Sequence, residues 1–288
     1  MSLDRIRLAS LHDKVISAEQ AAAFIKDGMT VGMSGFTRAG EAKAVPLALV
    51  KQAQANPLKI TLITGASLGN DLDKQLTEAG VLARRMPFQV DNTLRKAINK
   101  GEVMFIDQHL SETVEQMRNL QLKKPDVAVI EAVAITEDGG IIPTTSVGNS
   151  ASFAIFAKEV IVEINTNLSP AFEGLHDIYI PSYRPTRQPI PLTKVDERIG
   201  TAAINIDPAK IVGIVFNSEL HDSPSTVTEP DDETQGIANH LIAFFEKEVE
   251  EGRLPKDLGP LQAGIGSIAN AVLTGLKESN FEPKIPVE

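Results

Sequence analysis

The chain has 288 residues, a formal net charge of −10 and no cysteine, and 42% of its residues are hydrophobic. This length fits two ordinary domains or one large α/β domain, and this composition fits a globular protein with a sizeable core. The acidic balance argues against nucleic acid as a partner. The lack of cysteine excludes disulfides, thiolate metal sites and cysteine nucleophiles.

Neither a metal site nor a membrane segment is expected. The five histidines are scattered, without the H-x-x-x-H spacing of a zinc site. The sequence has no apolar run of roughly 18 residues, which a membrane-spanning helix needs. Its charged amino terminus lacks the apolar stretch of a secretory signal. We therefore expect a cytoplasmic protein without a membrane partner.

Up to residue 134, predicted helices alternate with predicted strands. Ser17 can cap the first helix, and the apolar run 127–134, interrupted only by Glu131, is typical of a strand buried on both faces. Helices are predicted over residues 17–27, 43–53, 72–79, 92–100 and 111–119. Strands are predicted over residues 29–32, 59–64, 103–107 and 127–134, and residues 82–86 are short and mixed in character.

The alternation continues beyond a turn at residues 137–140. Clustered prolines make residues 169–194 an irregular surface excursion. Strands are predicted at 141–143, 158–165 and 210–217, helices at 151–157 and 235–251, and a polar loop at 221–232. About seven strands alternating with helices predict an α/β fold with a mainly parallel open sheet and helices on both faces. No linker stands out, so residues 1–288 are expected to form one α/β domain.

The carboxyl ends of two predicted strands carry glycine-bounded loops. Residues 34–40 follow the first strand and include Gly35, and residues 65–69 follow the second and include Ser67. Open α/β sheets bind their ligands at this edge. These loops are therefore candidates for a binding site.

A third glycine turn, Gly264-Ile265-Gly266, precedes apolar residues at helical spacing through Leu276. Glycines at this point let a ligand approach the backbone, and the free N–H groups of the first helical turn can hold an anion or a carbonyl oxygen. The alternative is an ordinary turn between a loop and a helix.

Several long stretches resemble the class I coenzyme A transferases of the acetyl-CoA hydrolase/transferase group, of the succinyl-CoA:acetate and propionyl-CoA:succinate type. They run through essentially the whole chain in order. They are SGFTRAGEAK (34–43), LITGASLG (62–69), RRMPFQ (84–89), LRKAINKG (94–101), FIDQHLSE (105–112), DVAVIEAVAITEDGGIIPTTSVGN (126–149), RIGT (198–201) and LQAGIGSIANAVLTGLKESNF (261–281).

The resemblance implies an architecture of two α/β halves with coenzyme A between them. A glutamate carboxylate attacks the acyl-CoA thioester, a glutamyl-CoA thioester forms, and a second carboxylic acid then takes over the CoA. No metal or organic cofactor is implied, because coenzyme A is the substrate. The implied partners are acyl-CoA and a short-chain carboxylate. The residues that match CoA-contacting positions are Gly264, Ile265, Gly266, Ser267, Ile268 and Asn270. The alternative for Asn270 is a residue that only forms a hydrogen bond at the start of the helix.

One part of the family pattern differs in this sequence. The family places its nucleophilic glutamate after the last matched helix, in a tyrosine, serine or threonine, glutamate, valine run. Here Glu288 is the only candidate nucleophile, and it lacks that setting; the alternative is a frayed terminal acid. The sequence also lacks the second half of the family, so it is interpreted as an amino-terminal half.

Three further residues are candidates for binding because of their positions in the predicted elements. Gly35 is expected at the ligand-binding edge, and Ser67 either contacts the acyl group or caps the next helix. Thr93 is a candidate binding residue or a helix cap. Arg38 either pairs with a carboxylate or is solvated. Glu131 is expected to be buried with partners near the cleft, because an isolated buried carboxylate is costly.

The leading hypothesis is a CoA-transferase that moves CoA between short-chain acyl-CoA and a carboxylate. The first alternative is an acetyl-CoA hydrolase, in which water resolves the glutamyl thioester. The second is a non-catalytic CoA-binding half. An apolar face left by the missing half would drive self-association, so the chain is expected either to form a homo-oligomer or to pair with a carboxyl-terminal half.

Overall fold

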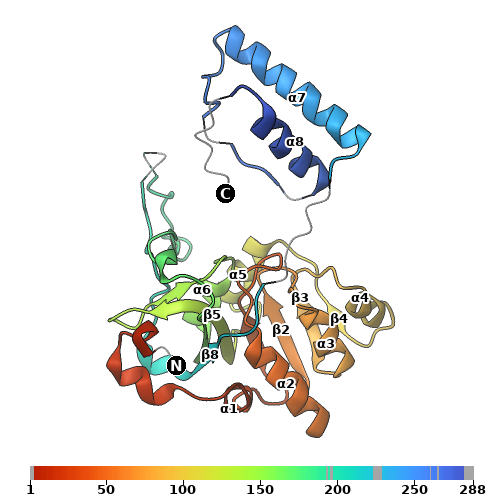
Figure 1. The fold of residues 1–288 in the computed structure, drawn as a ribbon. Helices are drawn as coiled ribbons and strands as arrows, with labels where there is room; N and C mark the ends of the chain where they lie inside the picture. Colours follow the sequence, from red (N-terminus) through yellow and green to blue (C-terminus); the bar gives the residue numbers. More distant parts are fainter. Residues whose placement is uncertain are drawn as a thin grey trace. The chain divides into compact units, whose positions relative to one another are not determined.

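The computed structural model describes residues 3–192, 194, 197–222, 229–259, 261–264 and 266–281. The chain divides into two compact units, Met1–Ser223 and Pro224–Glu288. The first unit contains the sheet and the second contains two long helices (Figure 1). Each unit is described by itself below.

The first unit is built on an eight-stranded sheet with the order β4-β3-β2-β1-β5-β7-β8, and β6 pairs with β5 outside that path. All the paired strands are parallel except β5 and β6. The predicted α/β class with a mainly parallel open sheet is therefore confirmed. The strands are β1 Thr30–Met33, β2 Ile60–Thr64, β3 Leu82–Met86, β4 Met104–Phe105, β5 Val127–Ile135, β6 Ile141–Pro143, β7 Glu159–Asn165 and β8 Ile211–Asn217.

The helices agree with the sequence pattern to within a few residues, except that the first is shorter than residues 17–27. Ser17 does cap it, in a reciprocal pair of hydrogen bonds with Gln20. The helices of the first unit are α1 Ala18–Ala22, α2 Ala44–Ala55, α3 Leu72–Glu78, α4 Asn92–Asn99, α5 Leu110–Arg118 and α6 Ser150–Phe156. Short 3-10 helices lie at Leu3–Arg5, Ala9–Lys14, Pro170–Phe172 and Pro208–Lys210.

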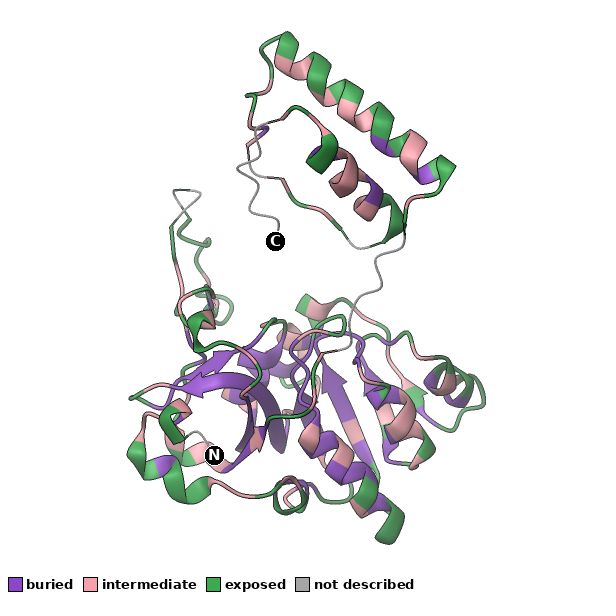
Figure 2. Ribbon diagram, in the orientation of Figure 1, coloured by how far each residue is buried: buried purple, intermediate pink, exposed green. Residues whose placement is uncertain are grey.

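Helices cover both faces of the sheet, because side chains alternate between the two faces along each strand. Val127 and Val129 of β5 pack in one core with α1, α2, α3 and α4. Ala128 and Ile130 pack in the opposite core with α5 and α6. All nine residues of β5 are buried, as Figure 2 shows for the central strands. The expected strand buried on both faces is thus confirmed.

The strand order reverses direction between β1 and β5. The chain moves outward from β1 through β2 and β3 to β4, then returns to the other side of β1 and continues through β5, β7 and β8. Such a reversal leaves a crevice at the carboxyl ends of the two strands, because their loops lead away in opposite directions. The topology therefore places a candidate site at the ends of β1 and β5.

The second unit pairs α7 (Asp232–Glu250) with α8 (Ser267–Glu278). α7 begins three residues earlier than expected, because the carboxylate of Asp231 accepts a hydrogen bond from the Thr234 amide and the Thr234 hydroxyl accepts one from the Asp231 amide. Gly252, with a φ of +72°, follows its end, as the sequence predicts. None of the helices among the described residues is both long and apolar enough to cross a bilayer.

Asp126 joins the start of β1 to the start of β5 and offers a test of the sheet's stability. Its carboxylate accepts hydrogen bonds from the Thr30 amide (2.9 Å), Lys123 (2.6 Å) and Lys158 (2.8 Å). Burial raises the pKa of Asp126, but these bonds outweigh burial and lower the pKa to about 2. The charged form is therefore the one that stabilises the fold.

We expect Asp126→Asn to lower the free energy of unfolding by about 1–3 kcal/mol at pH 7, because charge-assisted hydrogen bonds are lost. Because the pKa of Asp126 is lower in the folded than in the unfolded state, its carboxylate stabilises the fold at every pH above the unfolded-state pKa. That stability is lost as the pH falls toward 2. Urea unfolding should therefore show the two proteins converging at acid pH. The exposed Asp13→Asn is the control; a gap that stays constant down to pH 2 would contradict this account.

Candidate active site

The loops after β1 and β2 approach each other closely at the carboxyl edge of the sheet. A Cβ atom on Gly65 would overlap the backbone carbonyl oxygen of Gly35, so only glycine fits there. Gly35 itself has a φ of +128°, which favours glycine. Ser67 lies two residues farther along the second loop and is buried. The structure thus brings together the loops that carry Gly35 and Ser67.

A test of this close approach is Gly65→Ala. Because the obstructing atom belongs to the backbone, the new methyl group must push the two loops apart, at a cost of about 1–3 kcal/mol in the free energy of unfolding. Thermal unfolding measures this. The control is Gly236→Ala in α7, where an added Cβ meets nothing within 4 Å; that change should be neutral or stabilise by about 0.5–1 kcal/mol. Equal stability of the two variants would refute the close approach.

Below these loops lies a buried charged cluster centred on Lys43. Its ammonium group donates to the Glu131 carboxylate at 2.6 Å and to the Glu41 backbone carbonyl at 2.7 Å, and it pairs with the Asp222 carboxylate at 2.7 Å. The Lys43 and Glu131 side chains are at most 1% exposed. Burial lowers the pKa of Lys43, but Glu131 and Asp222 outweigh burial and raise it. The lysine therefore stays charged.

Glu131 is buried and fully partnered, as the sequence predicts. Besides the bond from Lys43, its carboxylate accepts hydrogen bonds from Thr144 (2.6 Å) and Asn165 (2.9 Å). Its backbone amide donates a hydrogen bond to the Ser34 hydroxyl (2.9 Å). Burial raises its pKa, and the bond to Lys43 opposes that rise. Glu131 therefore ties β5 to β1 at the reversal in strand order.

Two further acids of this cluster connect distant segments. Glu163, at the end of β7, accepts the backbone amides of Lys43, Ala44 and Val45, and so caps α2 from another strand. Asp222, after β8, accepts from the Gly40 amide (3.2 Å) and the Thr145 hydroxyl (3.0 Å). The cluster thus fixes the β1 loop and the start of α2 against β5, β7 and the segment that follows β8.

A polar pocket of about 240 Å³ opens beside these loops. It is lined by Arg38, Leu68, Gly69, Asn70, Asp71, Asp73, Lys74, Val90, Asp91 and Asn92. The Arg38 backbone (φ +71°) and that of Asn70 and Asp71 (φ +51° and +54°) are left-handed, a conformation that is costly for residues with a side chain. Strain of this kind gathers at functional sites. The pocket is therefore a candidate ligand site.

Thr93 stands next to this pocket without lining it. It lies in the first turn of α4, and Asp91 holds the cap position instead by accepting the Leu94 amide at 2.8 Å. The alternative that Thr93 caps the helix is therefore wrong. Asp71 holds the cap position of α3, so the alternative that Ser67 caps that helix is wrong as well.

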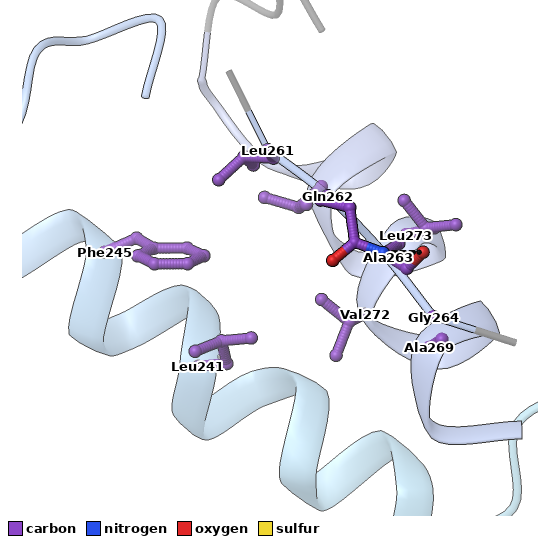
Figure 3. A pocket seen from close by; sticks show the side chains of 10 residues that line it. Leu241, Phe245, Leu261, Gln262, Ala263, Gly264, Ala269, Val272 and Leu273 are labelled. Atoms are coloured by element: carbon purple, nitrogen blue, oxygen red, sulfur yellow. Dashed lines mark hydrogen bonds between the residues drawn. The ribbon is translucent and has the colours of Figure 1, made fainter. Parts of the chain in front are cut away.

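In the second unit, the start of α8 is open. Gly266 precedes the helix with a φ of +121° and no side chain caps the first turn, while Ser267 and Ile268 are exposed. A mostly apolar pocket of about 180 Å³ lies beside it, where Leu241 and Phe245 of α7 face Val272 and Leu273 of α8 (Figure 3). Gly264 is part of its lining.

The predicted site residues therefore fall into two groups on different units. Gly35 and Ser67 lie in the first unit, with Thr93 nearby. Gly264, Gly266, Ser267, Ile268 and Asn270 lie at the start of α8, where the Asn270 amide bonds the Gly266 carbonyl at 3.0 Å. Ile265 and Glu288 lie outside the described residues. Their roles in binding and catalysis stay predictions.

Sequence reasoning missed the charged cluster that surrounds Glu131. Lys43, Glu163 and Asp222 are far apart along the chain, and only the strand order brings them together. Lys43 carries the clearest signal, since a lysine stands between two alanines directly before the apolar first turns of a helix.

Known proteins match this chain over most of its length. The family model described as acetyl-CoA hydrolase/transferase N-terminal domain matches residues 2–216. The chain is 46% identical to a succinyl-CoA:acetate CoA-transferase of Clostridium kluyveri over 280 residues, which cover 96% of this chain and 52% of the relative. It is 43% identical to an acetyl-CoA hydrolase of Kluyveromyces lactis over 290 residues, which cover 97% of this chain and 55% of the relative.

Solved structures share the fold. RipA from Yersinia pestis superposes with a TM-score of 0.66 at 17% identity, covering 97% of this chain and 57% of RipA. A 4-hydroxybutyrate CoA-transferase from Porphyromonas gingivalis superposes with a TM-score of 0.54 at 19% identity, covering 93% of this chain and 52% of that protein. The chain spans about half the length of the curated relatives it matches. On the family match and these identities, the chain belongs to the acetyl-CoA hydrolase/transferase family.

Proposed function

We propose that the chain contributes to the transfer of coenzyme A between a short-chain acyl-CoA, such as acetyl-, propionyl- or succinyl-CoA, and a carboxylate, through a glutamyl-CoA thioester. A glutamate carboxylate attacks the thioester carbonyl carbon and expels the CoA thiolate, which leaves a mixed anhydride. The thiolate then attacks the glutamyl carbonyl and releases the first acid. The acceptor carboxylate reverses both steps. Glu288 is the candidate nucleophile of this chain. The scheme needs no cofactor besides the substrate.

The start of α8 suits the first step of this scheme. The backbone N–H groups of the first turn of a helix are free to hold an oxyanion, and the positive end of the helix dipole adds to their effect. The loops of Gly35 and Ser67 suit the carboxylate, since ligands of α/β sheets bind at this edge.

The observation that carries the proposal is the open space at Gly264. A Cβ atom there would meet nothing within 4 Å, and no left-handed backbone demands a glycine. No close approach within this chain, among the described residues, explains the glycine. Gly236 shares this open space but lies inside α7, whereas Gly264 stands just before the uncapped start of α8, where a ligand can approach the backbone.

Gly264→Ala tests this. We expect unchanged thermal stability and an acetyl-CoA affinity reduced by roughly ten-fold, because the methyl group displaces the ligand. Isothermal titration calorimetry of the 288-residue chain measures the affinity, with Gly236→Ala as the matched control. Unchanged affinity for acetyl-CoA in Gly264→Ala would argue against this turn as the binding site.

A second experiment separates the three candidate activities. The chain is incubated with acetyl-CoA and deuterated propionate, alone and together with the carboxyl-terminal half of the Clostridium kluyveri transferase, and the products are analysed by mass spectrometry. Deuterated propionyl-CoA indicates a transferase. Free CoA without propionyl-CoA indicates a hydrolase. Binding without turnover under both conditions indicates a non-catalytic CoA-binding half and refutes the leading proposal.

A further inference from the structure

Glu41 fills the crevice between the β1 and β2 loops. It is fully buried. One carboxyl oxygen, Oε1, accepts a hydrogen bond from the Asn70 side chain at 2.9 Å and lies against Gly69, where a Cβ atom would overlap it. On its other side, a Cβ on Gly35 would lie 2.8 Å from the Glu41 Cβ. Glu41 therefore lies directly behind Gly69 and Asn70, which line the polar pocket.

The second carboxyl oxygen of Glu41, Oε2, is buried without a hydrogen-bond partner among the described residues. An ionised carboxylate with an unpartnered buried oxygen is costly. A protonated carboxyl is less costly, because the neutral group loses far less hydration free energy on burial.

The charges around Glu41 also favour its neutral form. Lys43 is the cation of the buried cluster, and it already pairs with Glu131 and Asp222. Glu163 is matched by three backbone amides, and Asp73 on α3 is paired with Arg85. Arg38 and Lys74 belong to the pocket lining rather than to the cluster. A third ionised acid beside one lysine would be left uncompensated.

The pKa of Glu41 also favours its neutral form. Burial raises it from the usual range to about 7, Lys43 opposes the rise, and Asp222 and Glu131 add to it. Glu41 therefore exchanges its proton near neutral pH, next to a pocket that contains the cations Arg38 and Lys74 and the side-chain amides of Asn70 and Asn92. The pocket lining also includes three acids: Asp73, which is paired with Arg85, Asp91, which caps α4, and Asp71.

We propose that Glu41 sets the affinity of this pocket for a carboxylate substrate by taking up a proton when the anion binds. The inference rests on the proposed function for its choice of ligand. A bound anion makes the ionised form of Glu41 less favourable, and by reciprocity the protonated form of Glu41 makes anion binding more favourable. Carboxylate affinity should therefore rise as the pH falls.

Calorimetry with sodium acetate as the probe tests the proposal. Titrations at pH 7 in buffers with different ionisation enthalpies give the number of protons taken up. We expect a fraction of a proton for the wild-type chain, and an affinity that weakens by roughly five-fold between pH 6 and pH 8. Glu41→Gln keeps an acceptor oxygen for Asn70 but has no proton to exchange, so its uptake should vanish and its affinity should not change with pH.

Two controls make the test specific. Glu112→Gln removes an exposed acid of α5 and should leave the proton uptake unchanged. A ¹³C NMR titration of the wild-type glutamate carboxyl groups needs no variant. One carboxyl should titrate near neutral pH, and its pKa should rise when acetate is added.

Acetate binding without proton uptake, uptake that persists in Glu41→Gln, or no acetate binding between pH 6 and pH 8 would each overturn the inference. None of these results bears on acetyl-CoA binding at α8, so the proposed function is tested separately by Gly264→Ala.

Discussion

Replacing Lys43 with methionine is expected to lower the free energy of unfolding by about 3–5 kcal/mol at pH 7, since removing one partner of a buried ion pair leaves the other charge uncompensated. Glu131 loses a 2.6 Å hydrogen bond inside the sheet, and Asp222 loses its ion pair. Urea unfolding followed by circular dichroism measures the loss.

The cost should shrink at acid pH, because burial raises the pKa of Glu131 and its protonation removes the uncompensated charge inside the sheet. Lys100→Met is the control, since the Lys100 side chain is 69% exposed and its ion pair with Glu102 is long, at 3.8 Å. That change should alter the free energy of unfolding by no more than about 0.5 kcal/mol. A loss for Lys43→Met that matches the control would mean that the buried cluster does not stabilise the fold.

Arg85→Met is expected to have a similarly large effect, about 3–5 kcal/mol, for the same reason. The guanidinium of Arg85 is fully buried on β3 and donates two hydrogen bonds to the Asp73 carboxylate, at 2.8 and 3.1 Å. It also donates to the carbonyl of Ala66, the neighbour of Ser67, at 2.9 Å. Its loss should therefore also loosen the β2 loop.

Hydrogen exchange measures the second effect, and amides of residues 65–70 should exchange faster in the variant. Arg85→Lys should be intermediate, because lysine keeps the charge but not the paired geometry of the guanidinium. Arg84→Met, next along the strand and half-buried, is the matched control. If the exchange rates of this loop are unchanged in Arg85→Met, the arginine does not hold the β2 loop.

Much of the fold follows from local patterns. The nine apolar-rich residues of β5 and the glycine turns after β1 and β2 lie where the sequence places them. β3 was harder to predict, because Arg84 and Arg85 interrupt its apolar run. Arg85 is tolerated inside the protein only because Asp73, from a different element, neutralises it, and no window of neighbouring residues contains that information.

Part of the candidate site was also predictable from local sequence, and part depends on contacts between distant segments. Gly35 and Ser67 follow strands, so the rule for parallel sheets predicts their proximity. Glu131 stands out as an acid in an apolar run, and its need for partners is predictable. The identity of those partners is not, because Lys43 and Asn165 lie 88 and 34 positions away from it along the chain and reach it only through the strand order.

The most direct test of the account is an NMR titration of the chain labelled with ¹⁵N at its 20 glycines, with acetyl-CoA and then acetate added. The account predicts that Gly264 and Gly266 shift with acetyl-CoA, and that Gly35, Gly65 and Gly69 shift with acetate. The signals of Gly28, Gly80 and Gly101, which precede β1, β3 and β4 at the edge of the sheet opposite Gly35, Gly65 and Gly69, should stay in place. Shifts confined to these three glycines, or no shift at saturating ligand, would contradict it.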